Sequence, residues 1–281
     1  MKPVMQHSPS PSAPRRRLVP WAGALLGAVW SMAASPALAT TIVATFTGPS
    51  PGGQTVQRTI LTGAGAPQLD SLQTPERFLL QQTGGTSANS FAGAGVAGYF
   101  YAFCIEPRQF ITLNQSTTYD DVVLSQGATN IGGMGVVKAS QIAELFGRFA
   151  PDLAAPMTAQ KAGALQIAIW EIVRETPGAA LDVFTGNIYF AAPETPSGML
   201  ALAESYVTAI TGTGPQASGL RALDNGILGD PSTTNGTQDL LVQTSSASLT
   251  AASAAPEPAS LALLATGAGL LGFARRRRRR G

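Results

Sequence analysis

The hydrophobic residues of the chain group into short segments up to residue 124 and into longer segments with helical spacing after residue 135. Residues 83–98 are too rich in glycine for a stable element and predict a loop. Three earlier segments are rich in β-branched and aromatic residues and are separated by turn-forming residues, which is typical of strands. These predicted strands are TTIVATF (40–46), TVQRTIL (55–61) and YFYAFCI (99–105).

The second half of the chain predicts helices. Thr158 has the character of an N-cap and Pro177 that of a helix stop. A strand pair is predicted over 181–190 and a late strand over 238–244. The predicted fold class is therefore α+β, with a β-sandwich or barrel-like core and an inserted or packed helical subdomain. The predicted helices span 136–150, 158–175 and 196–210.

The N-terminus has the pattern of an export signal. Three arginines at 15–17 precede an apolar run over 18–34, and Ala37 and Ala39 provide the small residues that a signal peptidase requires. A cleaved signal peptide is therefore predicted over 1–39. The alternative is an uncleaved membrane anchor, but the run is shorter than the ~20 residues of a membrane span. The sequence leaves the export route open.

The C-terminus contains three blocks in a fixed order. Pro256, Glu257 and Pro258 come first, and residues 259–274 then form an apolar run without a charge. Sixteen residues extend about 24 Å as a helix, which predicts a single short transmembrane span. Directly after such a run, a basic tail indicates a stop-transfer signal, with the rest of the protein outside the cytoplasm. The basic block is Arg275, Arg276, Arg277, Arg278, Arg279 and Arg280.

Residues 256–281 closely resemble the PEP-CTERM sorting signal of Gram-negative bacteria. The resemblance implies recognition by an exosortase, a transpeptidase-like processing enzyme of the inner membrane, and removal of the tail after translocation. It also implies an inner-membrane-anchored precursor that ends at the cell surface or in the exopolysaccharide of a biofilm matrix. A low-complexity linker over 245–255 separates this signal from the exported domain, which is predicted over 40–244.

Removing both predicted end segments reverses the charge of the protein. The whole chain has a formal net charge of +2, but ten of its eighteen basic residues lie before Thr40 or after Gly272. Residues 40–255 keep eight basic and fifteen acidic residues, which argues against nucleic acid as a partner. The only histidine, His7, lies in the signal region. The exported domain therefore lacks Cys-His and Ser-His pairs and the usual zinc ligands, and no metal or cofactor is expected.

Two residues of the exported domain are unusual for their positions. Cys104 is the only cysteine of the chain, so it has no partner for an internal disulfide. Gln166 lies in the middle of an apolar helical stripe. Burying its amide without hydrogen-bond partners costs about 1–3 kcal/mol. Gln166 is therefore either fully hydrogen-bonded in the fold or present for chemistry. The other residues of that stripe are Ala162, Ile169, Trp170 and Val173.

The segments around Cys104 and Gln166 resemble two motifs of the thioester domain of Gram-positive surface adhesins. That domain combines an aromatic-Cys-hydrophobic motif with a Gln-x-Ala-hydrophobic-Trp motif. The resemblance implies an internal thioester between Cys104 and Gln166, and it extends by order of elements over about 40–244. Leu165 departs from the pattern, because threonine is common at that position, and the Gram-negative sorting tail is a second departure. The implied supporting pocket consists of Phe103, Ile105, Ala168, Ile169 and Trp170.

The implied chemistry makes the protein a covalent binder. The thiolate of Cys104 attacks the side-chain carbonyl of Gln166, ammonia leaves, and a thioester joins the strand to the helix. The fold must supply proximity and exclude water, since the reaction is uphill in water. The acyl group then passes once to a partner nucleophile, either a surface amine or hydroxyl or an extracellular polysaccharide. A single-use binder is not a turnover enzyme and needs no cofactor.

Alternatives exist for both residues and for the function. Cys104 also fits a small buried hydrophobe or a disulfide between two chains, and Gln166 fits a hydrogen-bonded core glutamine. A passive extracellular matrix protein with an inert core would use the same tail. A polysaccharide-acting enzyme would need paired carboxylates, for which Glu106 and Glu171 are the candidates. Glu171 is expected to face solvent.

Overall fold

A computed structural model describes most of the predicted exported domain, residues 40–244. The predicted signal peptide (1–39), most of the predicted linker and the whole predicted sorting tail, with its predicted transmembrane span, lie outside the described residues. Within the part of the chain that is described, no helix is long and apolar enough to cross a membrane. The structure describes residues 40–52, 55–62, 66–69, 73–93, 95–107, 109–129, 133–191, 198–226 and 238–245.

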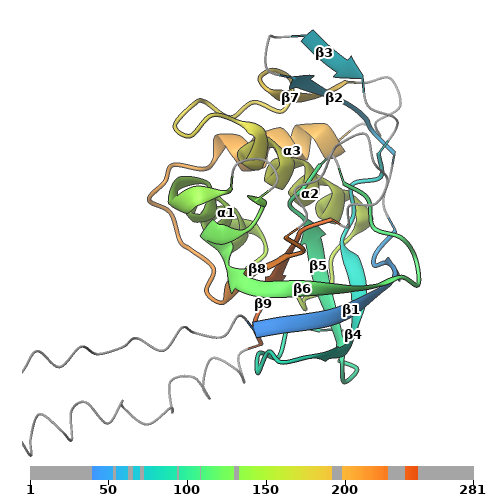
Figure 1. Cartoon of the computed structure of the whole chain (residues 1–281). Coiled ribbons are helices and arrows are strands. Elements are labelled where there is room, and N and C mark those ends of the chain that lie inside the picture. The colour runs from blue at the N-terminus through green and yellow to red at the C-terminus, as the bar shows by residue number, and fades with distance from the viewer. Residues whose placement is uncertain are drawn as a thin grey trace, which may run out of the picture. The chain divides into compact units, whose positions relative to one another are not determined.

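Six antiparallel strands close into a barrel in the order β1-β4-β5-β9-β8-β6 (Figure 1). Side chains alternate between the barrel interior and its surface, as Ile42 and Ala44 of β1 show, because successive residues of a strand point to opposite faces. The last two strands of the domain insert between β5 and β6. The barrel strands are β1 (Thr40–Pro49), β4 (Phe78–Gly85), β5 (Tyr99–Cys104), β6 (Ser116–Val123), β8 (Leu220–Asp224) and β9 (Leu240–Gln243).

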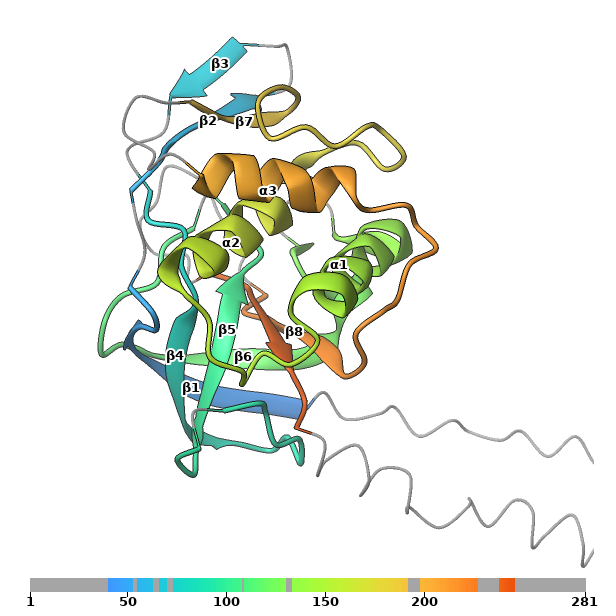
Figure 2. The same ribbon diagram turned by 180° about the vertical axis from the view of Figure 1, so that it is seen from behind.

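A second, smaller sheet has the order β3-β2-β7. It joins β2 (Gln57–Thr62) and β3 (Ala66–Leu69) from the first half of the domain to β7 (Ile188–Ala191) from the second half. Both views show this sheet on the opposite side of the helices from the barrel (Figures 1 and 2). The helices therefore lie between two sheets.

The helical layer consists of α1, α2 and α3, with a 3-10 turn, η1 (Leu124–Gln126), before α1. Thr158 caps α2 as predicted, since its hydroxyl accepts a hydrogen bond from the Lys161 N–H at 3.2 Å. Every residue of α2 from Ala162 to Val173 is buried. The predicted apolar stripe of this helix is therefore only part of its buried surface. The helices are α1 (Gly135–Phe149), α2 (Ala159–Arg174) and α3 (Met199–Thr208).

The predicted α+β class agrees with this barrel and its helices, and the three predicted helices and the strands that became β1, β2, β5 and β9 are confirmed. The predicted loop over 83–98 begins only after Gly85, where β4 ends. The strand pair predicted over 181–190 is wrong. The backbone N–H groups of Asp182 and Val183 donate instead to carboxylates from α2 and α3, so this segment forms turns. Only β7 forms there, and it pairs with β2.

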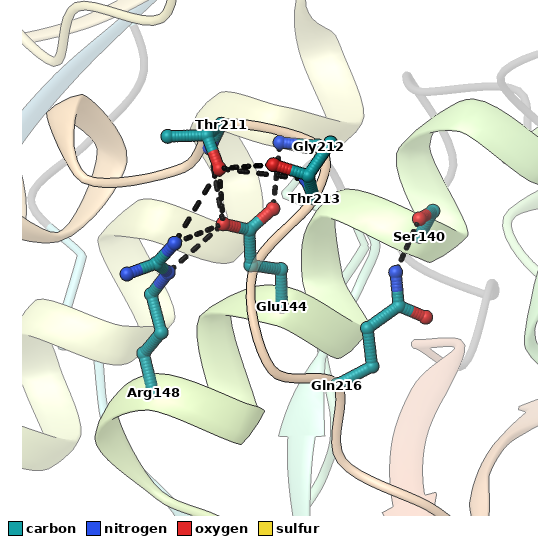
Figure 3. Close-up of polar contacts among 7 residues, drawn as sticks. All are labelled: Ser140, Glu144, Arg148, Thr211, Gly212, Thr213 and Gln216. Atoms are coloured by element: carbon teal, nitrogen blue, oxygen red, sulfur yellow. Dashed lines mark hydrogen bonds and ion pairs between the residues drawn. The ribbon is translucent and has the colours of Figure 1, made fainter.

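Glu144 joins α1 to the connection between α3 and β8 (Figure 3). Its carboxylate is fully buried and accepts hydrogen bonds from the N–H groups of Thr211 and Gly212 at 3.0 and 2.7 Å. Arg148 Nε and the Thr211 hydroxyl also donate to it, at 2.8 and 3.0 Å. Burial alone would raise the pKa of Glu144, but these donors outweigh it and hold the pKa below its ordinary value.

Replacing Glu144 by glutamine should lower the free energy of unfolding by about 1–3 kcal/mol at pH 7. A carboxyl with a depressed folded pKa stabilises the protein above its unfolded pKa of about 4.3, and this stabilisation is lost as the pH falls through the folded value. The difference in unfolding free energy between Glu144→Gln and wild type, measured with urea, should therefore be larger at pH 7 than at pH 3. The exposed Asp120 supplies the control variant, Asp120→Asn. An equal difference at both pH values would contradict an ionised Glu144.

Candidate functional site

Cys104 and Gln166 are brought together by the barrel and the central helix. Cys104 is the last residue of β5 and pairs with Leu240 of β9, and its side chain is fully buried. Gln166 lies in the middle of α2 and is 1% exposed. Residues that are 62 positions apart in the sequence are thus in direct contact.

The contact consists of two reciprocal hydrogen bonds. The backbone N–H of Cys104 donates to Gln166 Oε1 at 2.9 Å, and Gln166 Nε2 donates to the carbonyl oxygen of Cys104 at 2.7 Å. Together they fix the plane of the amide against the end of β5. They also offset the cost of burying the amide, so they fit the alternative of a hydrogen-bonded core glutamine as well.

The sulfur of Cys104 has its own polar contacts. Trp170 Nε1 donates to Sγ at 3.3 Å, and Sγ lies 3.1 Å from the carbonyl oxygen of Glu106. Burial raises the pKa of the Cys104 thiol far above its ordinary value, and the hydrogen bond from Trp170 acts in the opposite direction. The Cys104 thiol is therefore protonated at neutral pH.

Water is kept away from this pair by apolar side chains. The Phe103 ring packs against Phe146 of α1, with ring centroids 5.6 Å apart. Trp170 is only 3% exposed. All of the other residues of the implied pocket are fully buried: Phe103, Ile105, Ala168 and Ile169.

Both candidate carboxylates are buried. Glu106 is 1% exposed, and Glu171 is fully buried because α2 is covered on every side, so the expectation that Glu171 faces solvent is wrong. Burial raises the pKa of Glu171 to about 8, against the hydrogen bond that its Oε1 accepts from the Asp182 N–H at 2.9 Å. Three surface cavities of about 390, 350 and 330 Å³ include neither carboxylate in their linings. A polysaccharide-acting site built on Glu106 and Glu171 stays a prediction.

Sequence reasoning missed one residue beside this site. Arg58 of β2 is 1% exposed, and its guanidinium lies over the Trp170 ring, 5.4 Å from the centroid. The signal was a charged residue inside the predicted strand segment TVQRTIL, but nothing local shows where that side chain ends. Within the described residues, no group of three or more His, Cys, Asp or Glu side chains is arranged to hold a metal ion.

The comparisons with known proteins concern the other end of the chain. Residues 254–279 match the PEP-CTERM protein-sorting motif, which confirms the predicted sorting signal. The motif indicates an exported, membrane-processed protein of Gram-negative bacteria that an exosortase recognises. No curated protein and no solved structure matches the chain. The sorting-motif match does not include Cys104 or Gln166, so the thioester stays a prediction.

Proposed function

We propose that the protein attaches covalently to a partner at the cell surface or in the biofilm matrix through a thioester between Cys104 and Gln166. The reciprocal hydrogen bonds between the Cys104 backbone and the Gln166 amide are the observation that carries this proposal. They hold a thiol-bearing residue and an acyl group together in a buried site. The sorting tail brings such a binder to the outer side of the membrane.

The hydrogen bonds suit the formation of the bond. Sγ attacks Cδ of Gln166, the C–S bond forms, the C–N bond breaks, and ammonia leaves with the thiol proton. Negative charge develops on Oε1 during this step, and the Cys104 N–H already donates to that oxygen at 2.9 Å. The Cys104 carbonyl holds the leaving nitrogen through its 2.7 Å hydrogen bond. Burial keeps water from hydrolysing the product.

Transfer to the partner opens the thioester by attack at the same carbon atom, Cδ of Gln166. An amine or hydroxyl attacks Cδ, the C–S bond breaks, and the proton of the nucleophile passes to the sulfur. Gln166 then carries the partner as an amide or ester, and Cys104 is a free thiol again. Because the original amide is not regenerated, each molecule reacts once. Surface amines and the hydroxyls of an extracellular polysaccharide are the proposed nucleophiles.

A fluorescent primary amine should label the wild-type protein, and both Cys104→Ala and Gln166→Ala should abolish the labelling. Gln243→Ala is the matched control, because Gln243 is also a buried glutamine whose amide bonds to backbone groups, at Leu153, Pro151 and Ser218. Labelled denaturing gels read the result directly. If the wild-type protein stays unlabelled, Gln166 is a hydrogen-bonded core glutamine and the protein is a passive matrix component.

The sorting tail should be absent from the mature protein. In cells that have the exosortase, mass analysis of the cell-associated protein should find no peptide from Leu261–Gly281. Replacing Pro256, Glu257 and Pro258 together by alanine should leave the tail in place, because the enzyme no longer recognises it. A full tail on the wild-type protein in such cells would contradict processing.

A further inference from the structure

The small sheet holds Trp170 through two neighbouring residues. Arg58 of β2 and Phe190 of β7 are direct cross-strand partners, and both are almost fully buried. The Phe190 ring stacks on Trp170 at 6.2 Å with an interplanar angle of 12°, and the Arg58 guanidinium lies 5.4 Å from the Trp170 ring centroid. One face of the small sheet therefore positions the indole that donates to the Cys104 sulfur.

Arg58 also reaches the chain just after Cys104. Its Nη1 donates to the carbonyl oxygen of Pro107. Guanidinium stays protonated in proteins, so this contact places a permanent positive charge near the thiol. That charge lowers the pKa of Cys104, in the same direction as the Trp170 hydrogen bond, whereas burial and the charge of Glu106 raise it. Burying a guanidinium carries a desolvation cost that an apolar side chain of similar volume would avoid, so stability alone does not explain Arg58.

We infer that Trp170 and Arg58 assist the departure of the Cys104 sulfur when a nucleophile opens the thioester. As the C–S bond breaks, its electron pair moves to Sγ, and the proton of the attacking amine later neutralises the thiolate. Trp170 Nε1–H, 3.3 Å from Sγ, donates to the sulfur while it carries this charge. Arg58 is a positioning residue that holds the indole and adds a compensating positive charge. The inference rests on the proposed thioester.

Aminolysis rates of the full-length protein test this inference. The gain of mass on adding methylamine measures the thioester content, and its time course gives the rate constant. Trp170→Phe, which removes the N–H and keeps an aromatic ring, should slow aminolysis about tenfold or more. Arg58→Met should slow it similarly, and Arg58→Lys should restore part of the rate. Arg77→Met is the matched control, because Arg77 is a buried arginine stacked on a different ring, that of Tyr101, at 3.6 Å.

The aminolysis rates of Arg58→Met and Arg58→Lys, compared with each other, distinguish an effect of the Arg58 charge from an effect of its packing. If Arg58→Met reacts as fast as Arg58→Lys or faster, Arg58 only fills space and the inference is overturned. Rates equal to wild type in Trp170→Phe would overturn it as well, while the thioester itself would stand. A wild-type protein that gains no mass with methylamine would refute the thioester and this inference together. If circular dichroism shows that Arg58→Met does not fold, Trp170→Phe decides.

Discussion

Opening the bond between Cys104 and Gln166 with methylamine should lower the free energy of unfolding of the exported domain by about 4 kcal/mol. The two residues are 62 positions apart. A cross-link that closes a loop of this length restricts the unfolded chain and stabilises the fold by about that amount in the chain-entropy treatment. For a domain of about 200 residues, the unfolding midpoint should fall by roughly 10 °C.

Differential scanning calorimetry before and after methylamine treatment measures this effect. Cys104→Ala is the control, because without a thioester its midpoint should not respond to the amine. After treatment, the unfolding midpoint of the wild-type protein should lie closer to that of Gln166→Ala than to that of untreated wild type. A midpoint that methylamine leaves unchanged in wild type would mean that no covalent link joins β5 to α2.

The stability of the wild-type protein should fall as the pH rises from 5 to 8, and Glu171→Gln should remove most of that fall. Glu171 is fully buried, and its Oε2 has no hydrogen-bond partner among the described residues. Burial, reinforced by the charges of Glu175, Asp182 and Glu204, raises the pKa of Glu171 to about 8. The folded protein therefore keeps this proton at neutral pH, whereas the unfolded chain releases it above about pH 4.3.

The sign of the effect follows from this difference. Between pH 4.3 and 8 the unfolded state binds fewer protons than the folded state, so the free energy of unfolding falls by up to about 1.4 kcal/mol per pH unit. Between pH 5 and 7.5 the loss is about 3 kcal/mol. Asp239 acts in the same direction, because burial raises the pKa of its carboxyl to about 7. A smaller fall should therefore remain in Glu171→Gln.

Urea unfolding at pH 5, 6, 7 and 8 tests the Glu171 prediction. In Glu171→Gln the amide oxygen of the new side chain still accepts the hydrogen bond from the Asp182 N–H, so only the ionisation is removed. Glu144→Gln provides the comparison, because the lowered pKa of Glu144 places its titration below this pH range, so the stability curve of this variant should run parallel to that of wild type. Parallel stability curves for wild type and Glu171→Gln would show that Glu171 does not titrate in this range.

The three helices and the strands β1, β2, β5 and β9 could be predicted because their signals are local. The cap at Thr158 and the helical spacing after it fix the start and type of α2 without any distant contact. The prediction of a strand pair over 181–190 failed because carboxylates from α2 and α3 accept hydrogen bonds from the backbone of this segment, which is a tertiary effect. The burial of Glu171 is also a tertiary effect, because no residue pattern within α2 shows that other elements cover this helix on all sides.

The two central residues of the candidate site could be predicted from the sequence, but one residue beside them could not. Cys104 and Gln166 were singled out by a lone cysteine and a glutamine in an apolar stripe, and the fold brings them into contact. Arg58 could not be assigned to the site from its sequence context. Its place beside Trp170 depends on β2 pairing with β7, a strand from the second half of the domain.

Intact-mass measurement of the purified wild-type protein, before and after methylamine, tests the thioester most directly. The untreated protein should be lighter than the mass of its processed sequence by one ammonia. Treatment should add one methylamine per molecule and expose one titratable thiol at Cys104. A protein that already has its sequence mass when isolated without exposure to nucleophiles, and that methylamine leaves unchanged, would contradict the thioester and leave Cys104 a buried free thiol.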